Sequence, residues 1–443
     1  ISACLVGSEM CIRDRFYTLF GFLMMRVKDA SKLKKRAVVQ NVIMFVIFTI
    51  CSVTCMYYKW SVNTLVFFLL EFVYLILFIV LYRLIYPDCS IQIVNNMSML
   101  MMLGFVMVER LAPSSAFKQF VIVLIGTVIG FFVPRFMRKR HTIVKMKYLF
   151  AVIGILMLGI TLVLGKTTWG AQISVDIAGF SFQPSEFVKL IYVLFVAAML
   201  WRARTFGKVV ASAAIAAFHV LVLVASNDLG TALIFFVVYI VMLYVGTGKI
   251  RYLIAGLLTG CGAAVFAYKV FSHVRTRVYA WRDPWSIIDK GGYQITQSLF
   301  AIGTGGLFGM GLYQGLPNTI PVAVKDFVFA AMSEEFGMIF AICVILICFG
   351  SYMSMMRVAT RSRDIFYKLV AVGFSTMYIF QCFLTIGGVT KFIPSTGVTL
   401  PFVSYGGSSI LCSILMFAIV QAVFILVKEN EGDEAESKEQ KKA

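Results

Sequence analysis

Residues 228–246 read DLGTALIFFVVYIVMLYVG, a stretch whose only charged side chain, Asp228, stands at its first position. An α-helix rises about 1.5 Å per residue, so a run of this length nearly crosses the roughly 30 Å hydrocarbon core of a bilayer. A surface helix of a soluble domain would keep one polar face, and this stretch has none. It therefore predicts a transmembrane helix.

Further apolar runs of the same kind lie on both sides of this stretch. The twelve predicted spans cover residues 41–58, 64–81, 96–111, 117–134, 147–164, 185–201, 206–226, 228–246, 252–271, 328–350, 367–389 and 406–427. The 443-residue chain is 60% hydrophobic and 14% charged, and its mean hydropathy is +0.90. These values exclude a water-soluble protein and predict an all-α polytopic membrane protein.

Lysine and arginine recur in every second connection between the predicted spans. The basic segments are 28–36, 135–147, 202–208, 249–251 and 357–368. Because cytoplasmic loops carry an excess of these residues, we expect these segments on the cytoplasmic side of the membrane and the alternate loops, including 166–186 and 272–327, on its outer side. The formal charge of +19 then reflects membrane topology, and we expect no nucleic-acid partner.

The ends of the chain differ from its middle. Residues 1–15 read ISACLVGSEMCIRDR, which looks like a translated sequencing adapter, and they are treated as non-native. Residues 16–90 show no readable motif and are expected to form an accessory bundle of two to three transmembrane helices. Residues 91–427 contain the polar motifs. The tail 428–443, KENEGDEAESKEQKKA, is too polar to pack and is expected to be a disordered cytoplasmic segment.

Ionisable residues close to a bilayer are costly, and so they point to function. The first group lies in QPSEFVK (183–189), where Glu186 can pair with Lys189 one helical turn later. The second is Asp228. Each has a structural alternative: an ion pair that fixes a helix in the first case, and an N-cap in the second. The functional interpretation places Glu186, Lys189 and Asp228 in the wall of a substrate-binding cavity.

The longest connection, 272–327, is the third group, and loops of this length in compact proteins are usually functional. Arg275 and Arg277 lie on the side where few cations are expected, which indicates an anionic ligand such as pyrophosphate. Attraction to anionic lipid headgroups is the alternative. Gln294 is a further substrate-binding candidate. The glycine-rich run 303–311 has the spacing G-x-G-G-x-x-G-x-G and follows no strand, so it does not indicate a dinucleotide site.

The loop ends at KDFVFAAMSEEFG (325–337), which contains the candidate catalytic base. Asp326 lies where water meets the bilayer, and partial burial raises the pKa of a carboxyl group toward neutrality. A general base that accepts the proton of a sugar hydroxyl needs such a pKa. Lys325 is a candidate substrate-binding residue, and either Glu334 or Glu335, two turns further along, is expected to face the same cavity, with Glu335 as the substrate-binding candidate.

The fourth group is the segment 390–409, whose two prolines and three glycines exclude a continuous helix. Irregular backbone near a membrane must be covered by protein or water, so this segment favours a re-entrant lid beside a cavity. Lys391 and Ser404 are its candidate substrate-binding residues. No metal site is predicted, because the ten cysteines lack C-x-x-C spacing and the three histidines are scattered.

Together these motifs resemble the SEDS family (shape, elongation, division and sporulation), which comprises FtsW, RodA and SpoVE proteins. The matching stretches are QPSEFVKL (183–190), DLGTAL (228–233), DPW (283–285), GGYQITQSLFAIGTGGLFGMGL (291–312), KDFVFAAMSEEFG (325–337), RDIF (363–366) and IPSTGVTLPFVSYGGSS (393–409). The resemblance covers residues 95–427 and implies a core of ten transmembrane helices. Ten predicted spans follow residue 95, which leaves the extra N-terminal helices outside the core.

The resemblance implies a peptidoglycan glycosyltransferase that polymerises lipid II, a precursor carried on undecaprenyl pyrophosphate, at the outer face of the membrane. It implies a class B penicillin-binding protein as partner, and it makes Asp326 the catalytic carboxylate of an inverting transfer. Arg275, Arg277 or a divalent cation (Mg²⁺ or Mn²⁺) would neutralise the leaving pyrophosphate.

Two other functions stay open. A flippase or transporter of a lipid-linked precursor also needs polar groups within the membrane. An inactive scaffold would only recruit a synthase. The grouping of ionisable residues on one side of the membrane favours the enzyme over the transporter, and the intact Asp326 and the basic loop favour it over the scaffold.

Overall fold

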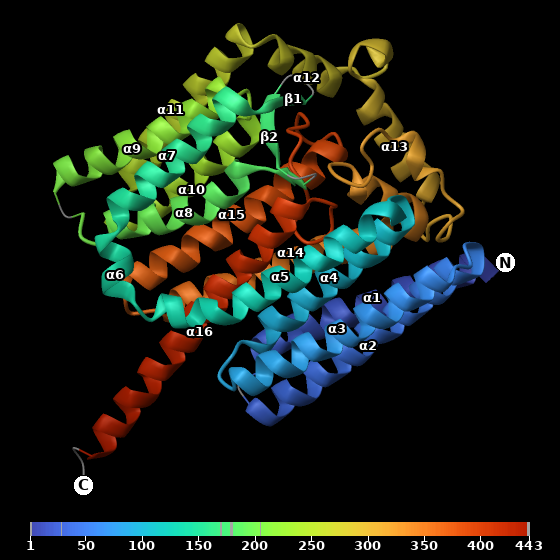
Figure 1. Cartoon of the computed structure of the whole chain (residues 1–443), viewed down its shortest axis with the longest axis horizontal. Helices are drawn as coiled ribbons and strands as arrows, with labels where there is room; N and C mark the ends of the chain where they lie inside the picture. Colours follow the sequence, from blue (N-terminus) through green and yellow to red (C-terminus); the bar gives the residue numbers. More distant parts are fainter. Residues whose placement is uncertain (1, 28, 169–170, 178–179, 204, 441–443) are drawn as a thin grey trace.

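The computed structural model describes residues 2–440 apart from 28, 169–170, 178–179 and 204, and this part of the chain is mainly helical (Figure 1). Each of the twelve predicted spans coincides with a helix. These helices are α2 (Ala30–Tyr58), α3 (Val62–Ile85), α4 (Ile91–Leu111), α5 (Pro113–Met137), α7 (Lys147–Leu164), α8 (Pro184–Leu200), α9 (Phe206–Ala225), α10 (Leu229–Thr247), α11 (Ile250–Val270), α14 (Val328–Arg361), α15 (Ile365–Val389) and α16 (Gly407–Gln440). The all-α polytopic class is confirmed.

Three helices precede the ten-helix core, as the sequence predicted for the accessory region. The first, α1 (Ser2–Arg26), packs on α2 and on core helix α14, while α2 packs on α4. Asn95 on α4 joins the two accessory helices. Its side-chain amide donates to Gln40 Oε1 on α2 (3.0 Å), and its main-chain carbonyl oxygen accepts from the hydroxyl of Tyr17 on α1 (2.9 Å). Polar contacts of this kind fix neighbouring helices in a bilayer, where lipid offers no hydrogen-bonding partner.

The core helices differ in how deeply they are buried. Helices α4, α8, α15 and α16 form the centre, and most of their spanning residues are buried. By contrast, α11 lies at the edge, where it packs mainly on α10 and has no buried residue. The polar motifs of α8, α10, α14 and α15 therefore meet inside the bundle rather than at its lipid-facing surface.

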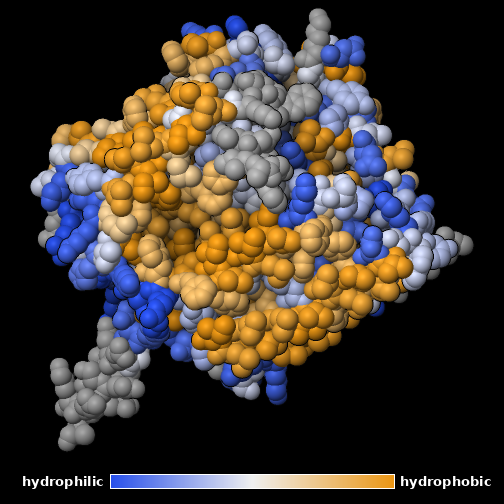
Figure 2. All heavy atoms as spheres, in the orientation of Figure 1, coloured by the Kyte–Doolittle hydropathy of each residue, from blue (hydrophilic) through white to orange (hydrophobic). Residues whose placement is uncertain are grey.

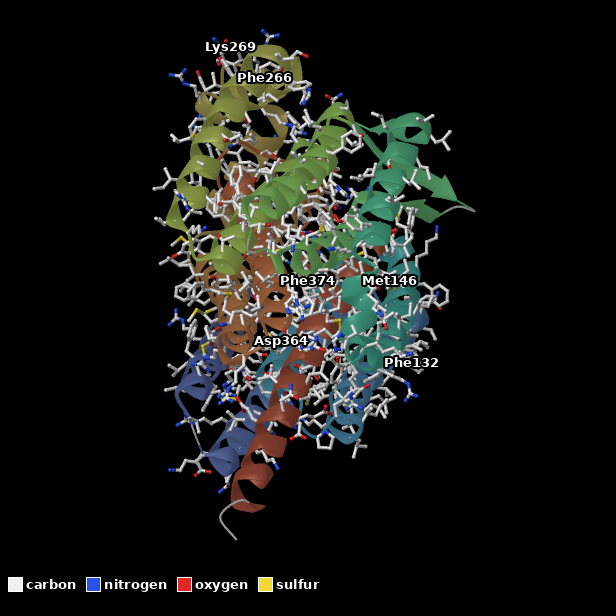
Figure 3. The ribbon with its side chains drawn as sticks, turned by 90° about the vertical axis from the view of Figure 1, so that its left-hand side faces the viewer. Phe132, Met146, Phe266, Lys269, Asp364 and Phe374 are labelled. Atoms are coloured by element: carbon white, nitrogen blue, oxygen red, sulfur yellow. The ribbon has the colours of Figure 1, made fainter. Side chains whose placement is uncertain are left out.

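The two ends of the bundle carry different elements (Figure 1). One end holds α12 (Ser272–Arg282), η1 (Ile288–Lys290), α13 (Tyr293–Gly305), η2 (Pro317–Thr319) and an antiparallel sheet of β1 (Lys166–Thr168), β2 (Ala171–Ile177) and β3 (Phe180–Phe182). The other end holds α6 (Arg140–Lys145) and the projecting C-terminal part of α16. In Figure 3, Lys269 near the end of α11 and this part of α16 lie at opposite ends of the molecule.

Apolar side chains form a broad band across the face shown in Figure 2. Large apolar residues are exposed on the outer helices, such as Phe132 on α5 and Leu258 on α11. Eleven helices in the described part of the chain are long and apolar enough to cross a membrane, and α8, with 17 residues, is only slightly shorter. Exposed apolar surface on this scale needs lipid around it, so the chain is a multi-pass membrane protein.

The structure corrects the expectation of a disordered tail after residue 427. Helix α16 continues to Gln440 without interruption. Alanine, glutamate, glutamine and lysine are good helix formers, and a helix that already exists extends without the cost of a new nucleus. The polar composition therefore excluded packing of the tail but did not exclude helix.

The small sheet in the connection 166–182 was not predicted either. Its outer strands have three residues each, which is too short for an alternating pattern to be recognised. Phe182, at the end of the sheet, stacks on Phe187 of α8 with a centroid distance of 4.7 Å. The sheet thus ends directly against the helix that carries Glu186 and Lys189.

Candidate active site

Asp326 and Arg277 both lie beside Gly397 in the segment 393–405, which we call the lid. Arg277, on α12, donates from Nη1 to the carbonyl oxygen of Thr396 (3.0 Å). A Cβ atom added to the neighbouring Gly397 would lie 3.7 Å from Arg277 Nη2 and 3.7 Å from Asp326 Oδ2. The carboxylate and the guanidinium are thus no more than twice that distance apart. Gly397 is exposed and has a φ of +72°, a backbone conformation that favours glycine, so no side chain stands between the two groups and the surface at this position.

The backbone beside the carboxylate is fixed by the lid. The buried hydroxyl of Ser404 donates to the carbonyl oxygen of Lys325, and it accepts from the amide of Leu400 (2.9 Å). The amide of Tyr405 donates to the carbonyl oxygen of Val324 (2.8 Å). Ser404 therefore acts on this site through the main chain, and the side chain of Lys325 points to the exposed surface.

The electrostatic surroundings suit a base. Burial raises the pKa of Asp326 above its ordinary value, while the positive charges of Lys325 and Arg277 oppose the rise. Burial likewise lowers the pKa of Arg277 from its ordinary value, against the attraction of Asp326. Arginine stays protonated under all ordinary conditions. The site thus combines a permanent cation with a carboxyl group that binds a proton more readily than a carboxyl group in water.

A buried polar cluster contacts the lid at Thr399 and confirms the predicted pairing of Glu186 with Lys189. Lys189 Nζ donates to Glu186 Oε1 (2.7 Å) and to Gln381 Oε1 of α15 (3.1 Å). The amide group of Gln381 in turn donates to the carbonyl oxygen of Thr399 in the lid (3.0 Å). The ion pair therefore connects α8 and α15 to the lid and supports the site from within the bundle.

Asp228 has the N-cap role that was one of its two interpretations. Its side chain caps α10 by accepting from the amide of Thr231 (3.2 Å), and it also accepts from the hydroxyl of Ser185 (3.3 Å). Its place in the wall of a substrate-binding cavity stays a prediction.

Lys391, Arg275 and Gln294 were also predicted to bind substrate. The carbonyl oxygen of Lys391, whose φ is +60°, accepts from Trp281 Nε1 (3.1 Å). This bond ties α12 to the residues just before the lid. Arg275 is exposed on α12, and Gln294 is half-buried on α13. Among the described residues, neither has a hydrogen bond or ion pair to Asp326, so both stay predictions for substrate contact.

Glu335 lies apart from the cluster, contrary to the expectation that it faces the same cavity. It is fully buried and forms an ion pair with Arg110 of α4 (2.7 Å), and it accepts from the amide of Tyr313 (3.2 Å). Its neighbour Glu334 accepts from the amide of Leu316 (2.9 Å). Both carboxylates therefore hold the loop 306–316. From the residues alone, this structural role could not be told apart from substrate binding.

Three further residues that shape the site were not predicted from the sequence. Trp281 and Thr396 hold α12 against the lid, and Gln381 connects the lid to Lys189. Gln381 carried a readable signal, since an amide in the middle of a predicted span needs a partner. Thr396 carried none, because it contributes its main-chain oxygen.

The chain was then compared with known proteins. Residues 89–428 match the FtsW, RodA and SpoVE family of cell cycle proteins. The chain belongs to this family. Its relatives include the peptidoglycan glycosyltransferase RodA of Mycobacterium tuberculosis, which is 33% identical over 353 residues covering 72% of this chain and 75% of that protein. The stage V sporulation protein E of Bacillus subtilis is 34% identical over 263 residues, or 58% of this chain and 72% of that protein.

Solved structures share the fold. One chain, from work on the coordination of polymerization and crosslinking by a peptidoglycan synthase complex, has a TM-score of 0.66 at 25% identity and covers 76% of this chain and 97% of its own. RodA of Thermus thermophilus has a TM-score of 0.57 at 24% identity and covers 76% and 96%. The unmatched quarter of this chain corresponds in length to the accessory helices and the C-terminal end.

The donor set of the site bears on a divalent cation. No group of three histidine, cysteine, aspartate or glutamate side chains in the described ranges is placed to hold a metal ion. Mg²⁺ commonly binds one or two carboxylates together with substrate phosphates. Asp326, the carboxylate that lies beside Arg277 at Gly397, fits such a mode.

Proposed function

We propose that this protein is a peptidoglycan glycosyltransferase that polymerises lipid II at the outer face of the cytoplasmic membrane. The observation that carries the proposal is the pair of Asp326 and Arg277 beside the exposed Gly397. Family membership and relatives named peptidoglycan glycosyltransferases support it. A base beside a fixed cation is the minimum that glycosyl transfer from a pyrophosphate requires.

In the proposed reaction, Asp326 accepts the proton of the acceptor hydroxyl as its oxygen bonds to the anomeric carbon of the donor sugar. The bond from that carbon to the pyrophosphate oxygen breaks on the opposite face, which inverts the configuration. The leaving pyrophosphate needs no proton, and Arg277 neutralises its developing charge. A Mg²⁺ or Mn²⁺ ion bound with the pyrophosphate would supply further positive charge.

The partner and the orientation belong to the same proposal. A class B penicillin-binding protein would crosslink the glycan strand that this chain makes, as the structurally similar synthase complex joins polymerization to crosslinking. The basic segments at the end that holds α6 support placing that end in the cytoplasm and the lid outside. Co-purification with such a partner tests the partnership. Labelling of an Asp289→Cys variant by an impermeant thiol reagent tests the orientation.

Asp326→Asn tests the enzymatic assignment. In vesicles containing the purified protein, fluorescent lipid II and the partner, the wild type should yield polymer and the variant none, because an amide cannot accept the hydroxyl proton. The matched control is Asp289→Asn, which removes an exposed carboxylate of the same loop and should leave polymerisation unchanged. Normal polymerisation by Asp326→Asn with an intact fold would refute the role of the carboxylate.

A flippase is the second candidate, since buried polar residues such as Lys189 and Glu186 also suit a transport path. The same vesicles decide between the two functions. Transfer of labelled lipid II between leaflets without polymer formation would indicate a flippase.

A further inference from the structure

Helix α14 is broken where the glycine-rich segment meets it. Gly337 has a φ of +87° and a ψ of 171°, so the helical ladder is interrupted there. The freed carbonyl oxygens of Glu334 and Glu335 accept from the amides of Met310 and Gly311, at 2.9 Å each. The segment 306–311 therefore pairs with α14 through its main chain, and the loop that follows leads to Asp326.

The next fixed point of this loop is Tyr313, which has an unusual backbone. Its φ of +69° lies in the left-handed region, where an aromatic residue is strained. Such a conformation persists only when its surroundings enforce it. The Tyr313 amide donates to Glu335 Oε1 (3.2 Å), and its ring lies 4.3 Å from the guanidinium carbon of Arg110.

The ring of Tyr313 also stacks on Tyr58, with a centroid distance of 5.7 Å and an interplanar angle of 19°. Tyr58 is the last residue of α2, an accessory helix outside the ten-helix core. Arg110 completes the arrangement, because its Nε donates to Glu335 Oε1 (2.8 Å) while a second nitrogen reaches the carbonyl oxygen of Gly315 (3.4 Å). We call Tyr58, Arg110, Tyr313 and Glu335 the Tyr313 junction.

The path from the junction to Asp326 is short and packed. Buried Ile320, Ala323 and Phe327 pack in one apolar cluster with Ala301 of α13 and Val389 of α15. The lid holds the same stretch at Val324 and Lys325, as described above. Because this stretch is packed and hydrogen-bonded, a displacement of the loop at Tyr313 is expected to displace Asp326 as well.

We propose that the Tyr313 junction is a positioning device through which accessory helix α2 holds the catalytic loop in its working conformation. Tyr58, Arg110 and Tyr313 are positioning residues and do not touch substrate. The accessory helices are then required for efficient turnover, although the base and the cation both belong to the core. The inference rests on the proposed function for its effect on turnover, and its effect on the loop can be measured without activity.

Tyr58→Ala is the decisive variant, because it removes the stacking of α2 on Tyr313 and leaves the core residues Arg110, Tyr313 and Glu335 unchanged. Tyr58 is 40% exposed at a helix end, so its loss leaves the helix packing in place. Trp60→Ala is the matched control: it removes a neighbouring aromatic residue that is 72% exposed. Aromatic pairs correspond to about a two- to tenfold change in an equilibrium constant. Hydrogen exchange of the amides at 310–313 should therefore accelerate by about this factor in Tyr58→Ala and stay unchanged in Trp60→Ala.

Activity gives a second readout that a loss of folded protein would not move. The charged groups that face Asp326 are Arg277 from α12 and the adjacent Lys325, and the lid contributes no charged residue. If the loop shifts away from Arg277, the acid limb of the pH profile of kcat/KM moves to higher pH. A smaller amount of folded enzyme would only scale the profile. Arg110→Lys, which keeps the charge but loses the planar contact with Tyr313, should shift the limb in the same direction.

The outcomes separate the two claims. Faster exchange at 310–313 in Tyr58→Ala together with a shifted acid limb supports the inference. Unchanged exchange in Tyr58→Ala, or acceleration of equal size in Trp60→Ala, overturns it. Absence of polymer from the wild type overturns the proposed function, whereas faster exchange in Tyr58→Ala would even then support the hold of α2 on the loop.

Discussion

The electrostatic coupling between Arg277 and Asp326 yields the sharpest prediction for the proposed reaction. The two atoms beside Gly397 are at most about 7 Å apart, since each lies 3.7 Å from the same point. At an effective dielectric constant of about 20 to 40, Coulomb's law gives an attraction of about 1–2 kcal/mol at this separation. This free energy favours the ionised carboxylate, so it opposes the rise that burial causes in the pKa of Asp326.

Replacement of Arg277 by glutamine removes this attraction. The pKa of Asp326 should then rise further, and because the base works only when deprotonated, activity should be lost first on the acid side. The acid limb of the kcat/KM profile therefore moves to higher pH. Polymerisation of lipid II in vesicles, measured from about pH 5 to 9, reports the limb directly.

Two matched variants isolate the charge from the other effects of the substitution. Arg277→Lys keeps a positive charge near the carboxylate, so its limb should stay close to that of the wild type even if the rate falls. Arg275→Gln removes an exposed charge from the same helix and should leave the limb in place. An unmoved limb in Arg277→Gln, or an equal shift in Arg275→Gln, would refute the coupling of Arg277 with Asp326.

Three further predictions concern the support of the site. Glu186→Gln or Lys189→Met alone should destabilise the protein by about 3–5 kcal/mol in thermal unfolding, because each leaves a buried charge unpaired. The double variant should lose less stability than either single variant, and equal losses would contradict this account. Gly337→Ala should prevent a stable fold, since its Cβ would lie 2.3 Å from the amide of Gly309, while Gly303→Ala, with open space around it, should match the wild type in yield and melting temperature. Chelation by EDTA should reduce polymerisation and added Mg²⁺ should restore it if a cation accompanies the pyrophosphate; undiminished activity in EDTA would leave that charge to arginine.

The sequence predicted those parts of the fold that depend on local patterns. Span length and hydropathy located all twelve helices, because a bilayer imposes one length on every crossing segment. The spacing of Glu186 and Lys189 predicted their ion pair, because residues three apart share a helix face. Asp228 was predicted as a cap from its place before an apolar run.

What the sequence did not predict depends on contacts between distant segments. Asp326 was expected to lie near Arg275 and Arg277, but nothing in the loop 272–327 indicates that Arg277 rather than Arg275 is the one beside it, because that choice follows from the path of an irregular chain. Glu335 was grouped with Asp326 on the grounds of its charge and spacing, yet its side chain is turned toward Arg110 of α4. The helical form of the tail was missed because its polarity argued only against packing.

The backbone pairing between segment 306–311 and the broken part of α14 has a consequence for redesign of the loop. It depends on close backbone approach at Gly309 and Gly337, where an added Cβ atom would lie 2.3 Å from a main-chain atom of the other segment. Exposed neighbours such as Gln314 and Asn318 carry no such restriction. Substitutions at these two exposed positions should therefore leave the pairing intact, whereas a side chain at Gly309 or Gly337 would break it.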